Sequence, residues 1–274
     1  MTTAARIAPL AAVLCLVATH AWAADGVLLV ETRTANGATQ TTQIQIEKTR
    51  MRAEVPGAQG AVQTVVFDGA AQVMRMIDTA NKSYVEISKA DVDQLSDQMS
   101  GAMAMMQERM KSLPPEQRAQ MEAAMRGRGM PGAAGAPAAA KTEYKKTGTG
   151  KVGKWTCDKY DGFQGDKKVS EICTVEPSAL GVSAGDFDVT KQMASFFQKI
   201  VPQSSGQMFS IGSAELGFSG IPVRSVIGIG GGRETTIEIT EVSRKNFTDA
   251  SYAVPDGFQK RASPFAGRGR GRQQ

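Results

Sequence analysis

Two cysteines, Cys157 and Cys173, constrain the fold of this chain more than any other feature, because they stand at mirror positions about Gly165. A turn at Gly165–Asp166 folds the flanking segments into a hairpin and brings the two cysteines opposite each other. Their spacing suits a cross-strand disulfide, a bond that forms in oxidising compartments. We therefore predict a structural disulfide, because a redox pair uses Cys-x-x-Cys spacing, which is absent here.

Residues 1–23 have the three-part pattern of a secretory signal peptide. Arg6 precedes an almost wholly apolar run at 7–18, and Ala-Trp-Ala at 21–23 fits a small-x-small cleavage site. This run is shorter than the ~20 residues needed to cross a bilayer, which disfavours the alternative of a retained anchor. Lipid attachment at Cys15 is a second alternative, disfavoured because no small residue directly precedes that cysteine. We expect a soluble protein exported to the periplasm.

Removal of the signal peptide also removes His20, the only histidine of the chain. Catalytic triads, histidine general bases and the common zinc sites need an imidazole, so these classes of site are excluded from the mature chain. Acidic residues are scattered, and a carboxylate pair like that of glycosidases has no support. We expect no catalytic residue, no metal site and no cofactor, and we predict that the protein is not an enzyme.

The basic charge lies mostly at the C-terminal end. The formal net charge is +5, and the last fifteen residues hold five basic and no acidic side chains. Residues 261–274 are predicted to be a disordered Gly-Arg tail that either improves solubility or contacts anionic lipid or envelope polymer. Because the rest of the mature chain is nearly neutral, nucleic acid is not an expected partner. We expect a monomer.

The first part of the mature chain has the pattern of an antiparallel meander. Short alternating or β-branched segments are separated by turn signals such as Asp68-Gly69. The predicted strands are 27–34, 43–47, 62–67, 72–77 and 83–87. In such a sheet one face packs on a core or a ligand while the other meets water.

At Ala90 the apolar period changes from two to about 3.6, which predicts a methionine-rich helical segment at 90–127. Leu113-Pro114-Pro115 divides it into a long helix and a shorter one at 116–126. The long helix has one apolar stripe, formed by Val92, Leu95, Met99, Met103, Met106, Met110 and Leu113. A segment rich in Gly, Ala and Pro follows at 128–140 and is predicted to be flexible.

The second part of the chain combines further strands with one helix. Strands are predicted at 141–149, in the cysteine hairpin, and at 208–211, 221–229 and 234–242. The helix is predicted at 188–201, with a buried stripe of Met193, Phe196, Phe197 and Ile200. The Gly230–Gly232 loop is not interpreted as a nucleotide site, because a strand follows it where such sites need a helix.

Eight of the fourteen methionines lie between residues 99 and 130, and three interpretations are open. Their regular stripe suits packing in a core. Methionine is flexible and polarisable, so the stripe also suits a surface that adapts to acyl chains or unfolded segments. Thioethers can bind copper(I), which is the third and least favoured interpretation.

Two sets of residues resemble known families. The order strand, Phe67-Asp68-Gly69, strand, Asp78 with Lys82, strand and helix resembles the meander of the bacterial lipoprotein-carrier fold, the group of LolA, LolB and LppX. Residues 153–160 and 254–258, Gly-Lys-Trp-Thr-Cys-Asp-Lys-Tyr and Val-Pro-Asp-Gly-Phe, resemble an uncharacterised periplasmic domain family often placed near those carriers. The resemblance implies an α+β fold: an unclosed antiparallel half-barrel whose concave face is covered by helices and can hold acyl chains.

We therefore predict one carrier-like domain at 24–260 that binds an apolar, lipid-like ligand or an acylated protein without catalysis. The expected ligand-binding residues are Val92, Leu95, Met99, Met103, Met106, Met110, Phe196 and Phe197. The alternative is a periplasmic chaperone or envelope-assembly partner that uses the methionine-rich helix, since 113–120 locally resembles the small helical chaperones of the Spy and CpxP type. Copper(I) binding by methionines is a more distant alternative.

Overall fold

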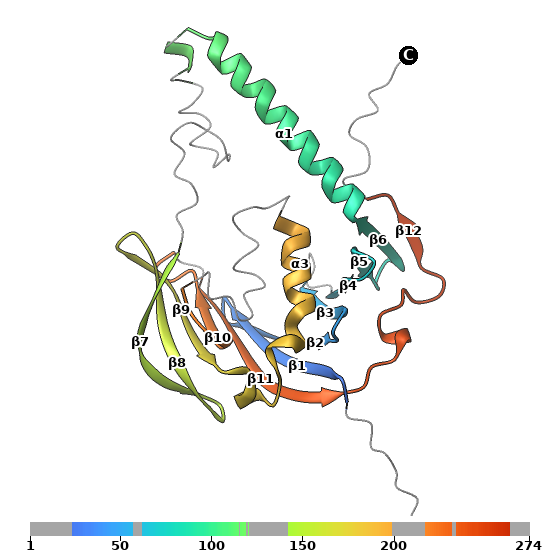
Figure 1. Ribbon diagram of the computed structural model, residues 1–274, viewed down its shortest axis with the longest axis vertical. Coiled ribbons are helices and arrows are strands. Elements are labelled where there is room, and N and C mark those ends of the chain that lie inside the picture. Colours follow the sequence, from blue (N-terminus) through green and yellow to red (C-terminus); the bar gives the residue numbers. More distant parts are fainter. Residues whose placement is uncertain are drawn as a thin grey trace, which may run out of the picture.

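A computed structural model describes most of the chain (Figure 1). The described residues are 24–56, 62–114, 116–118, 120, 142–198, 217–231 and 234–263. The predicted signal peptide, the flexible segment at 128–140, the strand at 208–211 and nearly all of the basic tail lie outside them.

The described strands form one open, mostly antiparallel sheet of 12 strands, ordered β12-β6-β5-β4-β3-β2-β1-β11-β10-β9-β8-β7. Among the described strands, only β12 and β6 pair in parallel. The strand bounds are β1 Gly26–Ala35, β2 Ala38–Ile46, β3 Arg50–Pro56, β4 Val62–Asp68, β5 Val73–Asp78, β6 Ser83–Ser88, β7 Glu143–Val152, β8 Trp155–Gln164, β9 Lys167–Val175, β10 Ile221–Ile227, β11 Thr235–Lys245 and β12 Gln259–Arg261.

The predicted meander is confirmed as strands β1 to β6, with consecutive strands paired side by side. Strand β3 was missed, although Met51, Ala53 and Val55 alternate with charged residues in the pattern of a half-buried strand. Strand β1 also pairs with β11 along its whole length, which joins the early and late parts of the chain into one sheet. Local patterns do not encode this pairing across about 200 residues.

Register irregularities distinguish the second part of the sheet from the meander. They interrupt the β1–β11, β9–β10, β7–β8 and β8–β9 pairings. An extra residue in one strand bends it and increases its twist. The sheet accordingly curves around helix α3, Asp188–Gln198 (Figure 1).

Helix α3 packs its apolar side onto one face of the sheet. Val189, Met193 and Phe196 belong to the same buried cluster as Val27 of β1 and Phe67 of β4. Each buried large apolar side chain contributes about 1.5–3 kcal/mol relative to exposure. The predicted helix at 188–201 is thus confirmed as far as Gln198, and it lies at the centre of the hydrophobic core.

The disulfide is confirmed, but the predicted pairing of its cysteines is not. Cys157 and Cys173 are bonded, with their Cα atoms 5.5 Å apart. Strands β8 and β9 are shifted by a bulge next to Gly162, so Cys173 pairs with Lys159 and the disulfide crosses the strands diagonally. The predicted pairing of Cys157 with Cys173, symmetric about Gly165, was wrong. The two-residue turn shifts the register by one position and the bulge shifts it by one more.

The C-terminal segment covers the other face of the meander. Tyr252, Val254 and Phe258 pack there against Val66. Val66 is therefore buried from one side of β4 while its neighbour Phe67 is buried from the other, each being 1% exposed. Two-sided cover explains why β4 carries consecutive apolar residues instead of an alternating pattern.

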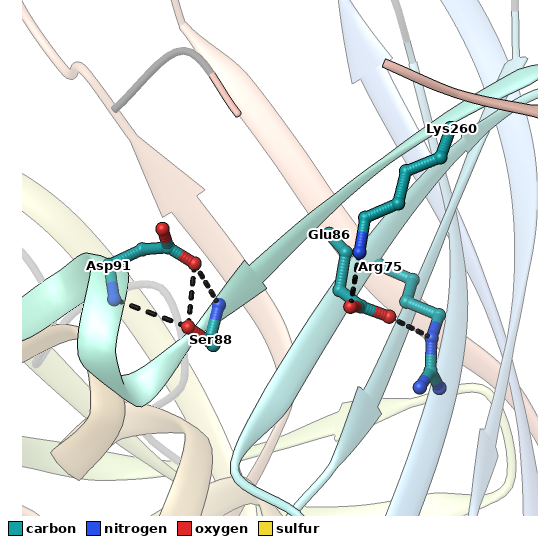
Figure 2. A network of polar contacts seen from close by, with 5 residues as sticks. All are labelled: Arg75, Glu86, Ser88, Asp91 and Lys260. Atoms are coloured by element: carbon teal, nitrogen blue, oxygen red, sulfur yellow. Dashed lines mark hydrogen bonds and ion pairs between the residues drawn. The ribbon is translucent and has the colours of Figure 1, made fainter. Parts of the chain in front are cut away.

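Helix α1, Lys89–Ser112, starts where β6 ends. Ser88 caps it: the Ser88 hydroxyl accepts from Asp91 N at 3.2 Å, and Asp91 Oδ2 accepts from Ser88 N at 2.8 Å (Figure 2). Reciprocal bonds of this kind satisfy backbone donors that have no partner within the helix. Beyond its start the helix runs away from the sheet (Figure 1). Among the described residues, Glu116–Arg118 and Gln120 are again helical.

None of the helices in the described part of the chain is both long enough and apolar enough to span a membrane.

Candidate functional site

The candidate site begins where the start of α1 meets the C-terminal half of α3. A cavity of about 80 Å³ lies between the two helices and the start of β5. It is lined by Gln72, Lys89, Val92, Asp93, Ser195 and Phe196. Two of the eight predicted ligand-binding residues, Val92 and Phe196, thus meet in one cavity although 104 positions separate them in the sequence.

Aromatic side chains of α3 form the inner wall of this junction. Phe196 packs edge-on against Phe67 of the sheet, with ring centroids 5.5 Å apart. Phe197 packs against Phe196 with centroids 5.2 Å apart and planes at 86°. Phe196 is buried, whereas Phe197 is half-buried. The chain places both predicted aromatic residues together because they are neighbours at the end of one amphipathic helix.

The other predicted residues lie along α1, on the face that begins at Val92. Leu95, Met103, Met106 and Met110 are half-buried, and Met99 is 40% exposed. Val92 is the one buried residue of this helix among the described residues. The structure therefore confirms the helix and its stripe, but contacts within the described residues do not bury the stripe as a core element.

The opposite face of α1 contains one further methionine. Met105 is 72% exposed and lies about 200° around the helix from Met103, given 100° per residue. It is the exception to the apolar periodicity. Met103 and Met105 therefore form a matched pair, with one on the stripe and one off it.

Polar residues of the cavity mouth were not predicted. Lys89 Nζ lies 2.5 Å from Asp93 Oδ2. This ion pair joins residues one helical turn apart on the surface of α1. Gln72 has a left-handed backbone, with φ of 51°, in the turn before β5. No periodic or motif signal in the sequence marks Gln72, Lys89 or Ser195, because they reach the cavity only through the packing of three elements.

One carboxylate lies among the apolar residues of β1. Burial raises the pKa of the Glu31 carboxyl, while a hydrogen bond donated by Thr42 Oγ1 at 3.3 Å and the charge of Arg33 oppose the shift. Within the described residues, no group of three or more His, Cys, Asp or Glu side chains could hold a metal ion. The methionines of α1 are outside this chemistry, since they are neither acidic nor imidazole ligands.

Both signature segments of the sequence are structural. Trp155 and Cys157 belong to the cluster around α3, whereas Tyr160 packs on the other face with Ile172 and Phe218. Val254 and Phe258 belong to the cluster of the C-terminal segment. These motifs thus identify the fold without supplying a reactive group.

The sheet, its disulfide and these signature residues define a domain that has been recognised as a family. Residues 88–258 match the domain of unknown function DUF4412, and the chain belongs to this family. The predicted resemblance to an uncharacterised domain family is thereby confirmed. A comparison with curated proteins finds no match.

The solved structures that the chain matches include three bacterial proteins. An uncharacterised conserved protein from Thermus thermophilus has a TM-score of 0.44 at 8% identity, with 87% of this chain and 91% of that chain covered. A LolA superfamily protein from Nitrosomonas europaea has a TM-score of 0.29 at 7% identity, with 83% and 89% covered. A DUF1329 family protein from Desulfovibrio piger has a TM-score of 0.21 at 9% identity, with 84% and 90% covered.

Proposed function

We propose that this protein is a non-catalytic periplasmic carrier or binding protein for an apolar, lipid-like ligand. One observation carries the proposal: an apolar surface starts in the cavity between α1 and α3 and continues along α1 without being buried by the described residues. We infer that the curved sheet is an unclosed half-barrel, with α3 and the start of α1 on its concave side. Residues 1–23 are proposed to be the signal peptide and 24–260 the domain.

The chemistry of this surface favours acyl chains over a rigid ligand. Its outer part consists of Met99, Met103, Met106 and Met110, whose unbranched thioether side chains adapt to differently shaped apolar partners. The cavity of about 80 Å³ can accept only the end of such a chain, because complete small-molecule sites usually enclose ~300 Å³ or more. We infer that an acyl chain inserts its end beside Phe196 and lies along the α1 stripe.

Two measurements test this proposal. The protein purified from its own periplasm should carry lipid detectable by native mass spectrometry or solvent extraction. In addition, the neutral apolar dye N-phenylnaphthylamine should bind with increased fluorescence, and acyl lipids should displace it. Met103→Gln should weaken dye binding about threefold or more, since it replaces apolar contact with a polar group.

Met105→Gln is the matched control, because it makes the same change on the exposed opposite face of the same helix. Equal binding by wild type and both variants, together with the absence of extractable lipid, would rule out the apolar site. Folding of each variant is checked by the retained Cys157–Cys173 bond in non-reducing peptide maps.

A chaperone or envelope-assembly role is the second candidate, and the exposure of the stripe favours it. Met99 is 40% exposed, so an unfolded segment could reach it. This role predicts that near-stoichiometric protein suppresses aggregation of unfolded envelope proteins. It also predicts that monomeric acyl lipid does not compete, whereas the carrier role predicts competition.

A further inference from the structure

A second cavity lies toward the β7 end of the sheet, beside the disulfide. Its volume is about 140 Å³, and strands β7 to β10 contribute its walls. It is lined by Gly150, Lys151, Val152, Lys159, Glu171, Ile172, Cys173, Arg224 and Val226.

The floor of this cavity is apolar. Val152, Cys173 and Val226 are 5%, 6% and 7% exposed, and the first two belong to the main hydrophobic core. Glycine at position 150 keeps the cavity open at the β7 side. A Cβ atom there would lie 3.0 Å from Lys159 Cδ and 3.5 Å from Cys173 Sγ.

The rim of the cavity is positively charged. Lys159 and Arg224 are exposed, and within the described part of the chain neither of them forms an ion pair. The one acidic lining residue, Glu171, is already paired, since its Oε1 lies 2.6 Å from Lys168 Nζ. Two cations at one opening repel each other, and an anion bound between them would relieve this repulsion.

The register of the sheet places these two cations on either side of Cys173. Cys173 pairs with Arg224 on one neighbouring strand and with Lys159 on the other. A guanidinium on β10 and an ammonium on β8 therefore flank the disulfide from opposite sides. Arginine binds planar oxyanions with two parallel hydrogen bonds, and lysine adds a point charge.

We propose that this cavity binds an oxyanion, a phosphate or carboxylate group, between Lys159 and Arg224. The apolar floor receives the first carbon atoms attached to that group. A volume of about 140 Å³ suits a headgroup but not a whole lipid, because complete ligand sites usually enclose ~300 Å³ or more. The inference does not depend on the apolar site at α1, because the two cavities share no lining residue.

Isothermal titration with three probes tests the proposal and distinguishes the sources of the oxyanion. The probes are inorganic phosphate, dihexanoyl phosphatidic acid and dihexanoyl phosphatidylcholine, all at concentrations below micelle formation. Wild type should bind the phosphatidic acid and not the phosphatidylcholine, and its affinity should fall with added salt. Equal affinity for inorganic phosphate would assign the pocket to a free oxyanion, whereas weaker binding of phosphate would assign it to a lipid headgroup.

A matched pair of double variants separates the pocket from general surface charge. Lys159→Gln with Arg224→Gln should weaken binding about tenfold or more, because both charge-assisted hydrogen bonds to the oxyanion are lost. Lys145→Gln with Lys154→Gln removes the same charge from exposed positions over the Phe163 and Trp155 rings, outside the cavity, and should leave affinity within about twofold. Equal weakening by both double variants would overturn the proposal, as would the absence of binding to wild type.

Gly150→Val supplies an independent test of the floor. The new side chain would fill the space beside Lys159 and Cys173 without removing a charge. If carbon atoms of the ligand occupy the floor, Gly150→Val should lower the affinity for the phosphatidic acid more than the affinity for inorganic phosphate. An unchanged affinity for both probes would overturn the location of the site.

Discussion

Helices α1 and α3 are both amphipathic, yet the shorter one is the structural element. Helix α3 has 11 residues and buries Val189 and Met193 at 0% and 2% exposure. Helix α1 has 24 residues and buries only Val92 among those described. Both carry methionine on their apolar faces. The difference shows that an apolar stripe indicates a helix but does not indicate whether that stripe packs inside the protein.

The cause lies in what surrounds each helix. Helix α3 is enclosed by the curved sheet, with residues of early and late strands in contact with it (Figure 1). Helix α1 is held at one end, by the Ser88 cap and by Val92 (Figure 2). We therefore expect α3 to respond to mutation through global stability, and α1 through ligand binding.

The largest expected effect is a difference between two methionine-to-alanine variants. Met193→Ala should lower the free energy of unfolding by about 2–5 kcal/mol, because it leaves a cavity in the core. Met99→Ala, at an exposed position of α1, should change it by no more than about 0.5 kcal/mol. Urea unfolding of the ligand-free protein measures both values. Similar losses in the two variants would show that α1 is also packed.

Loss of the disulfide should destabilise the sheet around α3 and leave α1 unaffected. Replacing Cys157 and Cys173 together by alanine frees a loop closed across 16 positions and should cost about 3 kcal/mol. Hydrogen exchange should then accelerate in α3 and β9, whose residues share a cluster with the cysteines. A matching acceleration at Met103 and Met106 relative to wild type would contradict the separation of the two helices.

The cap at the base of α1 should affect that helix more than the rest of the protein. Ser88→Ala removes the hydroxyl that accepts from Asp91 N and should cost about 1 kcal/mol of helix stability. Hydrogen exchange should accelerate in the first turns of α1. Ser183→Ala, at the N-cap of the short 3-10 helix Ala184–Phe187 that precedes α3, is the control and should leave α1 exchange unchanged.

The smallest effect concerns the strand from which α1 begins. Glu86 accepts hydrogen bonds from Lys260 Nζ at 2.7 Å and Arg75 Nε at 3.0 Å, and these bonds hold the pKa of its carboxyl below the ordinary value (Figure 2). A pKa that is lower in the folded state stabilises the protein above the unfolded pKa, about 4.3 for Glu. This contribution is lost as the pH falls through the lower, folded-state pKa.

Glu86→Gln should therefore be less stable than wild type at pH 7, and the difference should shrink below about pH 4.3. Thermal unfolding over this pH range measures it. Glu108→Gln changes an exposed ion pair on α1 and serves as the control, with a smaller difference expected at every pH. A difference for Glu86→Gln that does not depend on pH would show that its ion pairs with Lys260 and Arg75 do not stabilise the fold.

Much of the local structure could be predicted, and the errors have a common origin. The meander, the cysteine hairpin and both helices follow from alternation, from turn residues such as Gly165 with φ of 62°, and from helical periodicity. Strand β3 was missed although its residues alternate, and the ion pair of its Arg50 with the distant Asp249 could not be predicted from local patterns. The candidate site was predicted in its apolar residues, whereas Gln72 and Ser195 come from elements whose meeting depends on the fold.

The sequence by itself indicated most of the strands, the two helices, and which two cysteines can bond. These features depend on interactions between residues close in the chain, or on the identity of the only available partner. Tertiary structure decided that α3 is buried and most of α1 is not, that Cys173 pairs with Lys159, and that Lys159 and Arg224 line one cavity. Such features depend on the pairing of β1 with β11 and on bulges that shift the register, and neither is encoded in any local pattern.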